Sequence, residues 1–372
     1  MMGPLAISFI SILLLYAVVM GIVRIGLVHL TEPGQEQPGA PVPVTVVVPF
    51  RNEAGNLMNL LDDLSQQLYP ADLLWVILVN DHSTDGSGDL ARVRAAKRPG
   101  VTCLDLPEGA HGKKAAIELA LSMATTDWII QTDADCRVGP GFVQSHVAWL
   151  ERHPSDLVAG WVTTREEGSG FLEAFERTEL LGLTGTGAAS FRLGRPVMCS
   201  GANLMYTKAL HGDTRRFDPG GKVASGDDMF LMIGARKLGK RLTFNPGKRG
   251  MVQTGVAPGF GSLIGQRIRW GGKSSRYRVA DIQLLALLVA VANLMVFLAP
   301  LFMLLQKGSA WWFAAAAGLK VAADLMVVTA AAGKTGQRVT SRWYLPVLLL
   351  YHPYMVLVIA GSLLNTPSWK GR

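Results

Sequence analysis

Three groups of acidic residues follow one another along the chain, and their side chains are suited to binding a cation and a phosphorylated ligand. The first lies within residues 80–85 (Asn-Asp-His-Ser-Thr-Asp), the second at 133–135 and the third at 227–228. Each lies where a predicted strand gives way to a loop, and open α/β sheets bind their ligands at that edge. Carboxylates gathered there can hold a divalent cation, which in turn can hold a diphosphate. A nucleotide-diphosphate ligand is therefore the first hypothesis.

The second group has the spacing of a metal site. Asp133 and Asp135 stand two residues apart on a turning loop, so both can face one ligand, and they repel each other unless a cation or a proton lies between them. Surface turns also carry such pairs, but the buried strand predicted at 128–131 favours the ligand interpretation. For Asp81 and Asp85 two interpretations stay open: a contact to a base or ribose, or turn formation and helix capping.

The third group begins a predicted helix. Helix N-termini favour a negatively charged side chain, and one acid is enough for that role. Because two acids, Asp227 and Asp228, are present, one of them can act as a general base. Lys113 begins another predicted helix, behind His111 and Gly112, where backbone N–H groups and its ammonium can meet phosphate. The spacing around Lys113 is not that of a Walker A loop.

Gln266, Arg269 and Trp270 are spaced i, i+3 and i+4, so they share one face of a helix. They can close over a diphosphate and an acceptor, or lie on an anionic bilayer as part of a basic amphipathic helix, and both can hold together. Lys320 and Asp324, four residues apart in an apolar segment, form either an ion pair or a contact to a lipid-linked acceptor.

The elements that must position these residues alternate between buried strands and amphipathic helices. This alternation predicts an α/β fold with a doubly wound, mostly parallel sheet. The predicted strands are 44–49, 73–79, 101–106, 128–131 and 157–163, with one or two more in 197–206, and the predicted helices are 57–67, 89–97, 113–124, 142–152, 171–183 and 227–238.

Composition and hydropathy point to a membrane protein. Hydrophobic residues make up 49% of the chain and charged residues 17%, which is too apolar for an ordinary soluble enzyme. The net charge of +8 comes without a basic run or a zinc pattern, so nucleic acid is not expected as a partner. Residues 1–23 carry no charge, and the segments 282–306, 310–331 and 343–369 are each long enough to span a bilayer.

The predicted organisation has five parts. These are an N-terminal transmembrane anchor (1–30), a Pro/Gly-rich linker (31–43), a catalytic α/β domain (44–255), an amphipathic interfacial segment (256–280) and a three-helix transmembrane region (281–372). Lys334, Arg338 and Arg342 place the loop between the last two spans in the cytoplasm, and four spans then place the catalytic domain there too. We expect a multi-pass protein of the cell inner (plasma) membrane.

Taken in order, these motifs resemble those of membrane-anchored family 2 glycosyltransferases with a GT-A catalytic domain. The segments that carry the likeness are 46–53 (Val-Val-Val-Pro-Phe-Arg-Asn-Glu), 79–85, 133–135, 200–203 (Ser-Gly-Ala-Asn), 226–228 and 266–270. The last has the Q-x-x-R-W pattern typical of processive polysaccharide synthases. Asn80 stands in place of the commoner first Asp, and Asp227 in place of the usual Glu. Only four spans are predicted, so a short polymer or a single transfer to a lipid is as credible as polymerisation.

The resemblance implies an inverting displacement in cell-envelope polysaccharide or glycolipid synthesis. It implies that Asp228 is the general base, and that Asp135 and Asp133 bind the cofactor, Mg²⁺ or Mn²⁺. A nucleotide-diphosphate sugar, with a UDP-sugar favoured, is expected as the donor, and a glycan or lipid as the acceptor. The residues implied for nucleotide-sugar binding are Pro49, Arg51, Glu53, Asp81, Lys113, Asp133, Gln266, Arg269 and Trp270, and those for the acceptor are Asn203, Asp227 and Trp270. The alternatives are a catalytically silent membrane partner with the same fold and a nucleotidyltransferase.

Overall fold

The chain divides into two compact units. The computed structural model describes residues 4–31, 40–166, 168–218, 226–273, 276–306, 308 and 310–364. Residues of 31–165 and 194–255 form one unit, here called the sheet unit, and residues of 1–30, 166–193 and 256–367 form the other, the helical unit. Most of the predicted linker (32–39) and the end of the last predicted span (365–369) lie outside the described residues.

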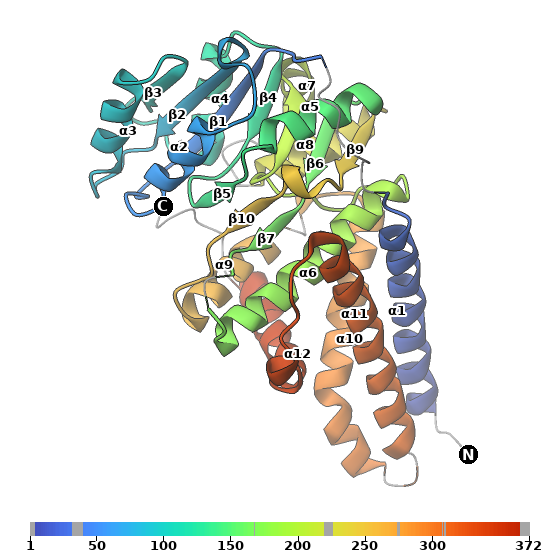
Figure 1. The fold of residues 1–372 in the computed structure, drawn as a ribbon. Helices are drawn as coiled ribbons and strands as arrows, with labels where there is room; N and C mark the ends of the chain where they lie inside the picture. The colour runs from blue at the N-terminus through green and yellow to red at the C-terminus, as the bar shows by residue number, and fades with distance from the viewer. Residues whose placement is uncertain are drawn as a thin grey trace. The chain divides into compact units, whose positions relative to one another are not determined.

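The sheet unit contains a mixed, mostly parallel sheet of seven strands (Figure 1). In spatial order they are β3 (Val101–Asp105), β2 (Leu74–Asn80), β1 (Val44–Phe50), β4 (Trp128–Gln131), β8 (Leu204–Thr207), β6 (Leu157–Gly160) and β9 (Leu242–Asn245). Strand β8 runs antiparallel to both of its neighbours, and the other pairs are parallel. A second sheet holds β5 (Cys136–Val138), β10 (Val252–Thr254) and β7 (Val162–Thr164). The predicted doubly wound sheet is confirmed.

The predicted strand 157–163 is wrong as a single element. It is divided between β6 in the large sheet and β7 in the small one. The division falls at Trp161, which is fully buried. Its indole N–H donates to the Pro246 carbonyl at 3.2 Å, and its ring packs edge-on against Phe244. Anchoring this large side chain turns the chain from one sheet into the other.

Helices cover both faces of the large sheet because its strands are apolar on both sides. All seven residues of β1 are buried. Leucines of α2 and apolar residues of α5 share one core with alternate residues of β1 and β2, whereas α4 packs on β1 and β2 outside that core. The helices of this unit are α2 (Leu57–Ser65), α3 (Ser87–Ala96), α4 (Lys113–Met123), α5 (Phe142–Arg152), α7 (Lys208–Thr214) and α8 (Asp227–Lys237), with short 3₁₀ turns at Ala71–Leu73, Arg215–Phe217 and Lys248–Gly250.

The helical unit contains four helices that are long and apolar enough to cross a membrane, one N-terminal and three C-terminal, as predicted. They are α1 (Pro4–Val28), α10 (Ala280–Leu305), α11 (Ala310–Thr335) and α12 (Ser341–Leu364). In Figure 1, α1, α10 and α11 lie side by side, and α12 packs on α10 and α9. The unit also contains α6 (Phe171–Arg192) and α9 (Phe260–Gly271).

Helix α6 groups with the apolar helices, whereas its segment was expected inside the catalytic domain 44–255. Small residues explain this packing. A Cβ added to Gly185 would lie 2.9 Å from the Ala331 side chain of α11, and one added to Gly26 of α1 would lie 3.1 Å from that of Ala189. Between apolar helices in lipid the hydrophobic effect contributes little, and small residues stabilise the packing because they let the helix backbones approach closely.

The predicted pairing of Lys320 with Asp324 is present among the apolar helices. The Lys320 ammonium lies 2.6 Å from an Asp324 carboxylate oxygen and donates to the Asn293 side chain at 2.9 Å. The Tyr16 hydroxyl donates to the other Asp324 oxygen at 2.5 Å. The two charges thus have polar partners from α1 and α10 as well as each other, which is how ionisable groups become tolerable at membrane depth.

A buried charge cluster holds α9 against α6. Arg267 is 4% exposed, and its guanidinium lies 3.0 Å from Glu179 and 3.5 Å from Glu176. Burial raises the pKa of Glu179, while Arg267 acts in the opposite direction. The Arg267 guanidinium also lies 4.2 Å from the Trp270 ring centroid. The helix that carries the Q-x-x-R-W pattern is therefore fixed by an arginine inside that pattern.

Replacing this arginine should destabilise the helical unit. Arg267→Gln leaves two buried glutamates without their cation, and breaking a buried pair in this way typically costs about 3–5 kcal/mol. Thermal unfolding in detergent measures the effect, with Arg269→Gln, the same change two residues along, as the matched control. Equal melting temperatures for the two variants would show that the cluster does not anchor α9.

Candidate active site

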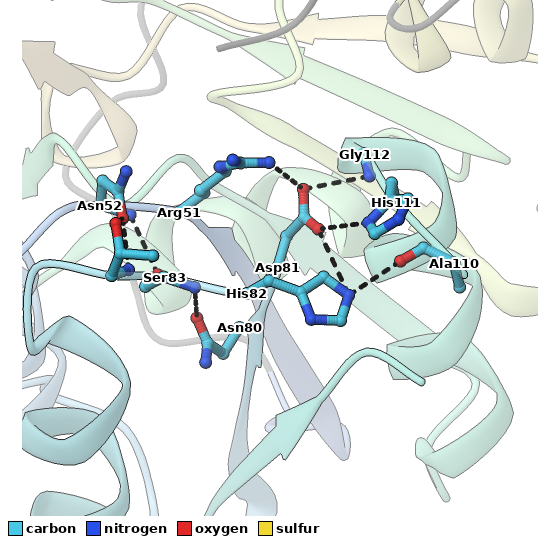
Figure 2. A network of polar contacts seen from close by, with 10 residues as sticks. Arg51, Asn52, Asn80, Asp81, His82, Ser83, Ala110, His111 and Gly112 are labelled. Carbon is cyan, nitrogen blue, oxygen red and sulfur yellow. Dashed lines mark hydrogen bonds and ion pairs between the residues drawn. The ribbon is translucent and has the colours of Figure 1, made fainter. Parts of the chain in front are cut away.

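The first acidic group surrounds Asp81, at the end of β2. Its side chain is 1% exposed. One carboxylate oxygen, Oδ2, accepts a hydrogen bond from the Gly112 N–H at 3.1 Å and lies 3.8 Å from the Arg51 guanidinium (Figure 2). Gly112 has φ +94°, a left-handed conformation that disfavours side chains, and it directly precedes α4. The ends of β1, β2 and α4 therefore meet at this carboxylate.

Asp85 has the turn-forming role that the sequence left open. Its carboxylate accepts hydrogen bonds from the Ala54 N–H at 2.9 Å and from the Ser87 hydroxyl at 2.6 Å. Burial opposes ionisation, but these hydrogen bonds prevail and lower the pKa of Asp85. The bond to Ala54 ties the loop after β2 to the loop after β1, which carries Arg51 and Glu53, and so fixes the geometry around Asp81.

The second group meets Lys113. Asp133 and Asp135 lie in the turn between β4 and β5, closed by the hydrogen bond from the Cys136 N–H to the Asp133 carbonyl at 3.1 Å. The Lys113 ammonium lies 2.6 Å from an Asp133 carboxylate oxygen. The predicted D-x-D pair is thus on the same edge of the sheet as Asp81, and a lysine from α4 neutralises one member.

The third group is oriented by backbone and amide donors. One Asp228 oxygen accepts the Gly201 N–H at 2.9 Å, and the other accepts the Met229 N–H at 2.7 Å. Asp227 accepts from the Gln131 side-chain amide at 2.8 Å. These donors fix both carboxylates at the start of α8, and each carboxylate oxygen has lone pairs for a further partner.

Gly201 shows how closely these groups approach one another. A Cβ at this position would lie 2.7 Å from the Gln131 amide nitrogen, 3.2 Å from the Lys113 ammonium and 3.4 Å from an Asp227 oxygen. Burial alone would lower the pKa of Lys113, but the charges of Asp133, Asp227 and Asp228 raise it above its usual value. The second and third acidic groups therefore form one cluster around one ammonium.

The charge and donor set of this cluster fit a divalent cation bound with a diphosphate. Three carboxylates act on Lys113, and Asp135 stands two residues from Asp133. Mg²⁺ and Mn²⁺ are bound by carboxylate oxygens, and Mg²⁺ commonly takes one or two carboxylates with substrate phosphate oxygens. The excess of negative charge can be balanced by the cation, and Lys113 can then turn to a phosphate.

Asn203, for which an acceptor contact stays a prediction, is held by hydrogen bonds inside the sheet unit. It is fully buried, and its amide donates to the Trp161 and Gly250 carbonyls, both at 2.8 Å. Its oxygen lies 2.8 Å from a ring nitrogen of His146, and burial lowers the pKa of that imidazole to about 4, which keeps it neutral. The side chain therefore links the start of β8 to α5 and to the residues just before β7 and β10.

We therefore expect Asn203→Ala to act on stability rather than on acceptor affinity. It leaves two buried carbonyls and one imidazole nitrogen without partners, at about 1–3 kcal/mol each before relaxation. The melting temperature of the variant should be clearly below that of the wild type. A KM for the acceptor that rises while the melting temperature stays the same would instead support the acceptor role.

Gln266, Arg269 and Trp270 belong to the helical unit, on α9. The side chain of Trp270 is 42% exposed, and the Gln266 amide oxygen accepts a hydrogen bond from the Arg267 guanidinium. Their roles at the nucleotide stay predictions, as do those of Pro49, buried within β1, and Glu53.

Sequence reasoning missed Gln131 and the tight approach at Gly201. Gln131 donates to Asp227 and accepts from the Tyr206 hydroxyl at 3.1 Å, so it joins the D-x-D strand to the helix acids. Its place at the end of a buried strand, just before the D-x-D turn, was the available signal. The closeness of Gly201 to Lys113 depends on segments far apart in the chain.

Comparison with known proteins gives the class. Residues 45–213 match the model of glycosyl transferase family 2, and these residues form a family 2 glycosyltransferase domain. The chain is 27% identical, over 192 residues, to a dodecaprenyl-phosphate galacturonate synthase of Rhizobium johnstonii, a match that covers 50% of this chain and 56% of that protein. It is 24% identical to the glycosyltransferase AglE of Haloferax volcanii, across 61% of this chain and 71% of that one.

A solved structure shares the fold over nearly the whole chain. It is the mannosyltransferase PcManGT from Pyrobaculum calidifontis, in complex with GDP-Man and Mn²⁺. The TM-score is 0.63 at 20% sequence identity, over 96% of this chain and 97% of that one. The likeness confirms the GT-A architecture.

Proposed function

We propose that the chain is an inverting glycosyltransferase that moves a hexosyl or N-acetylhexosaminyl group from a nucleotide-diphosphate sugar to a glycan or lipid acceptor. The observation that carries this proposal is the convergence on Lys113: Asp133 lies 2.6 Å from its ammonium, and the charges of Asp227 and Asp228 act on it too. One cluster thus combines groups for a leaving diphosphate with groups for an attacking hydroxyl.

Asp228 is the general base in this proposal. Hydrogen bonds from Gly201 and Met229 hold its two oxygens in place, and the lone pairs that remain can take the proton of an acceptor hydroxyl. The hydroxyl oxygen bonds to the sugar C1 as the C1–O bond to the diphosphate breaks, which inverts the configuration. Asp227, held by Gln131, contributes to acceptor binding.

Asp133 and Asp135 would hold Mg²⁺ or Mn²⁺, which would neutralise negative charge on the leaving diphosphate. Lys113, whose ammonium lies 2.6 Å from Asp133, would bind a phosphate oxygen of the donor. Asp81, with Arg51 beside it, receives the nucleoside. In the related solved structure the bound donor is GDP-Man, so the base preferred by this chain, with UDP favoured, stays part of the proposal.

The reaction takes place on the cytoplasmic face of the inner membrane in this proposal. The basic loop that carries Lys334, Arg338 and Arg342 supports this orientation by the positive-inside rule. Within the helical unit, the Lys334 ammonium lies 2.6 Å from the Leu30 carbonyl, where the chain leaves α1. The exit from the first span and the basic loop therefore lie at the same end of that unit.

A donor screen with product analysis tests the proposal. Purified protein in detergent is given UDP- and GDP-sugars with Mn²⁺ and a native lipid extract, and the transferred sugar is examined by NMR. An anomeric configuration opposite to that of the donor is expected. Retention of configuration would contradict the single-displacement mechanism, and release of pyrophosphate would favour a nucleotidyltransferase.

A further inference from the structure

Asp81 lies between two histidines. His82 follows it directly, and His111 precedes the Gly112 turn at the start of α4. In Figure 2 both rings point toward the same carboxylate oxygen, Oδ1. The His111 Nδ1 lies 3.7 Å and the His82 Nε2 4.0 Å from it, and the three atoms all lie within 4.8 Å of one another.

The two oxygens of Asp81 have different surroundings. Oδ2 faces the Gly112 N–H and the Arg51 guanidinium, which orient the carboxylate. Oδ1 is buried and accepts no hydrogen bond from any residue that the structure describes. A buried carboxylate oxygen without a donor costs free energy unless a cation compensates it. The oriented carboxylate therefore offers one oxygen toward the imidazoles.

We infer that Asp81, His82 and His111 form a binding site for a transition-metal cation such as Zn²⁺, separate from the D-x-D pair. Two imidazoles and one carboxylate are a ligand set that first-row transition metals prefer, whereas Mg²⁺ prefers oxygen ligands alone. The Asp81 side chain is 1% exposed, but those of His82 and His111 are 29% and 43% exposed. A cation can therefore enter from solvent and keep water as a further ligand.

The geometry requires a small contraction. Ligands bound at about 2.1 Å lie roughly 3.0–3.4 Å apart in tetrahedral or octahedral sites. The 3.7 Å contact of His111 with Asp81 must therefore shorten by about 0.3–0.7 Å, and the 4.0 Å contact of His82 by about 0.6–1.0 Å. The His82 Nε2 also lies 3.1 Å from the Ala110 carbonyl, a contact that the metal must displace. This contact and the nearby Arg51 charge limit the affinity.

Occupancy should exclude the nucleotide. This consequence, unlike the site itself, rests on the proposed function, in which Asp81 receives the nucleoside. A cation on Oδ1 takes the carboxylate that the nucleoside needs and fixes both histidines across it. Zn²⁺ should therefore raise the apparent Kd of UDP or GDP, in contrast to Mg²⁺ at the D-x-D pair.

Zinc binding by the full chain tests the site. Metal-stripped protein in detergent, with Mg²⁺ in excess to occupy the D-x-D pair, is titrated with Zn²⁺ by calorimetry, and with Co²⁺ by visible absorption. The variants are His82→Gln and His111→Gln, with His153→Gln at the C-terminal end of α5, outside the three-residue group, as the matched control. Melting temperatures equal to that of the wild type establish that the variants are folded.

We expect one Zn²⁺ to bind to the wild type and to His153→Gln. Loss of a residue that only orients a metal ligand typically lowers metal affinity by about 10–100-fold. Loss of either imidazole, which is itself a ligand, should therefore weaken Zn²⁺ binding by at least about 100-fold. The inference is overturned if the wild type binds no Zn²⁺ under these conditions, or if either site variant keeps wild-type affinity. These readouts need no sugar transfer, so failure of the proposed enzymatic function would leave them unchanged.

Discussion

Asp228→Asn should reduce sugar transfer by about 10³–10⁴-fold while nucleoside-diphosphate affinity stays within about threefold of the wild type. The asparagine keeps the size of the side chain and an oxygen for one of the two backbone N–H donors, but it cannot take a proton. General-base catalysis typically contributes 10²–10⁴-fold, and here the attacking hydroxyl has a pKa far above neutrality. Single-turnover transfer at saturating donor measures the loss.

Asp227→Asn is the matched control, because it makes the same change one residue away. It removes the negative charge of a side chain that accepts a hydrogen bond from Gln131, and it should mainly raise the KM for the acceptor. If instead Asp227→Asn abolished turnover and Asp228→Asn kept it, the two roles would have to be exchanged. Equal rates for wild type and Asp228→Asn would remove both the base and the mechanism built on it.

Asp135→Asn should cut turnover by about 10²–10³-fold and raise the Mn²⁺ concentration for half-maximal rate at least about tenfold. Metal stabilisation of a leaving diphosphate is worth several kcal/mol, and each 1.36 kcal/mol corresponds to a factor of ten in rate. The measurement is the rate as a function of Mn²⁺ concentration, with a chelator as the zero point.

Asp89→Asn is the control for this second prediction. Asp89 lies on α3 with its side chain 81% exposed, and its partner is the surface residue Arg92. The same loss of charge there should change the rate by less than twofold. A wild-type rate that is unaffected by the chelator would contradict the assignment of Asp133 and Asp135 as metal ligands.

Much of the alternation of strands and helices, though not β5, β9, β10 or α7, could be predicted, as could the acidic edge of the sheet, because their signals are local. Buried strands such as β1 and β2 are short apolar runs, and parallel strands bring their carboxyl ends to one edge. From the sequence alone, that rule predicts that Asp81 and Asp133 lie on the same edge of the sheet. The four apolar segments could also be predicted, since length and hydropathy alone define a candidate span.

The remainder depends on contacts between distant segments, which local patterns do not contain. The division between β6 and β7 is set by the burial of Trp161 against Phe244. The grouping of α6 with the apolar helices follows from the fit of Gly185 against Ala331. The three hydrogen-bond partners of Asn203 come from α5 and from loops beside the small sheet, and its role at the acceptor stays a prediction.

The most direct test of the central claim is release of nucleoside diphosphate by the purified wild-type chain. The account predicts release that requires Mn²⁺ or Mg²⁺, requires an acceptor from the lipid extract, and disappears in Asp228→Asn. Release that persists in Asp228→Asn at the wild-type rate would contradict the proposal that the cluster around Lys113 performs the transfer.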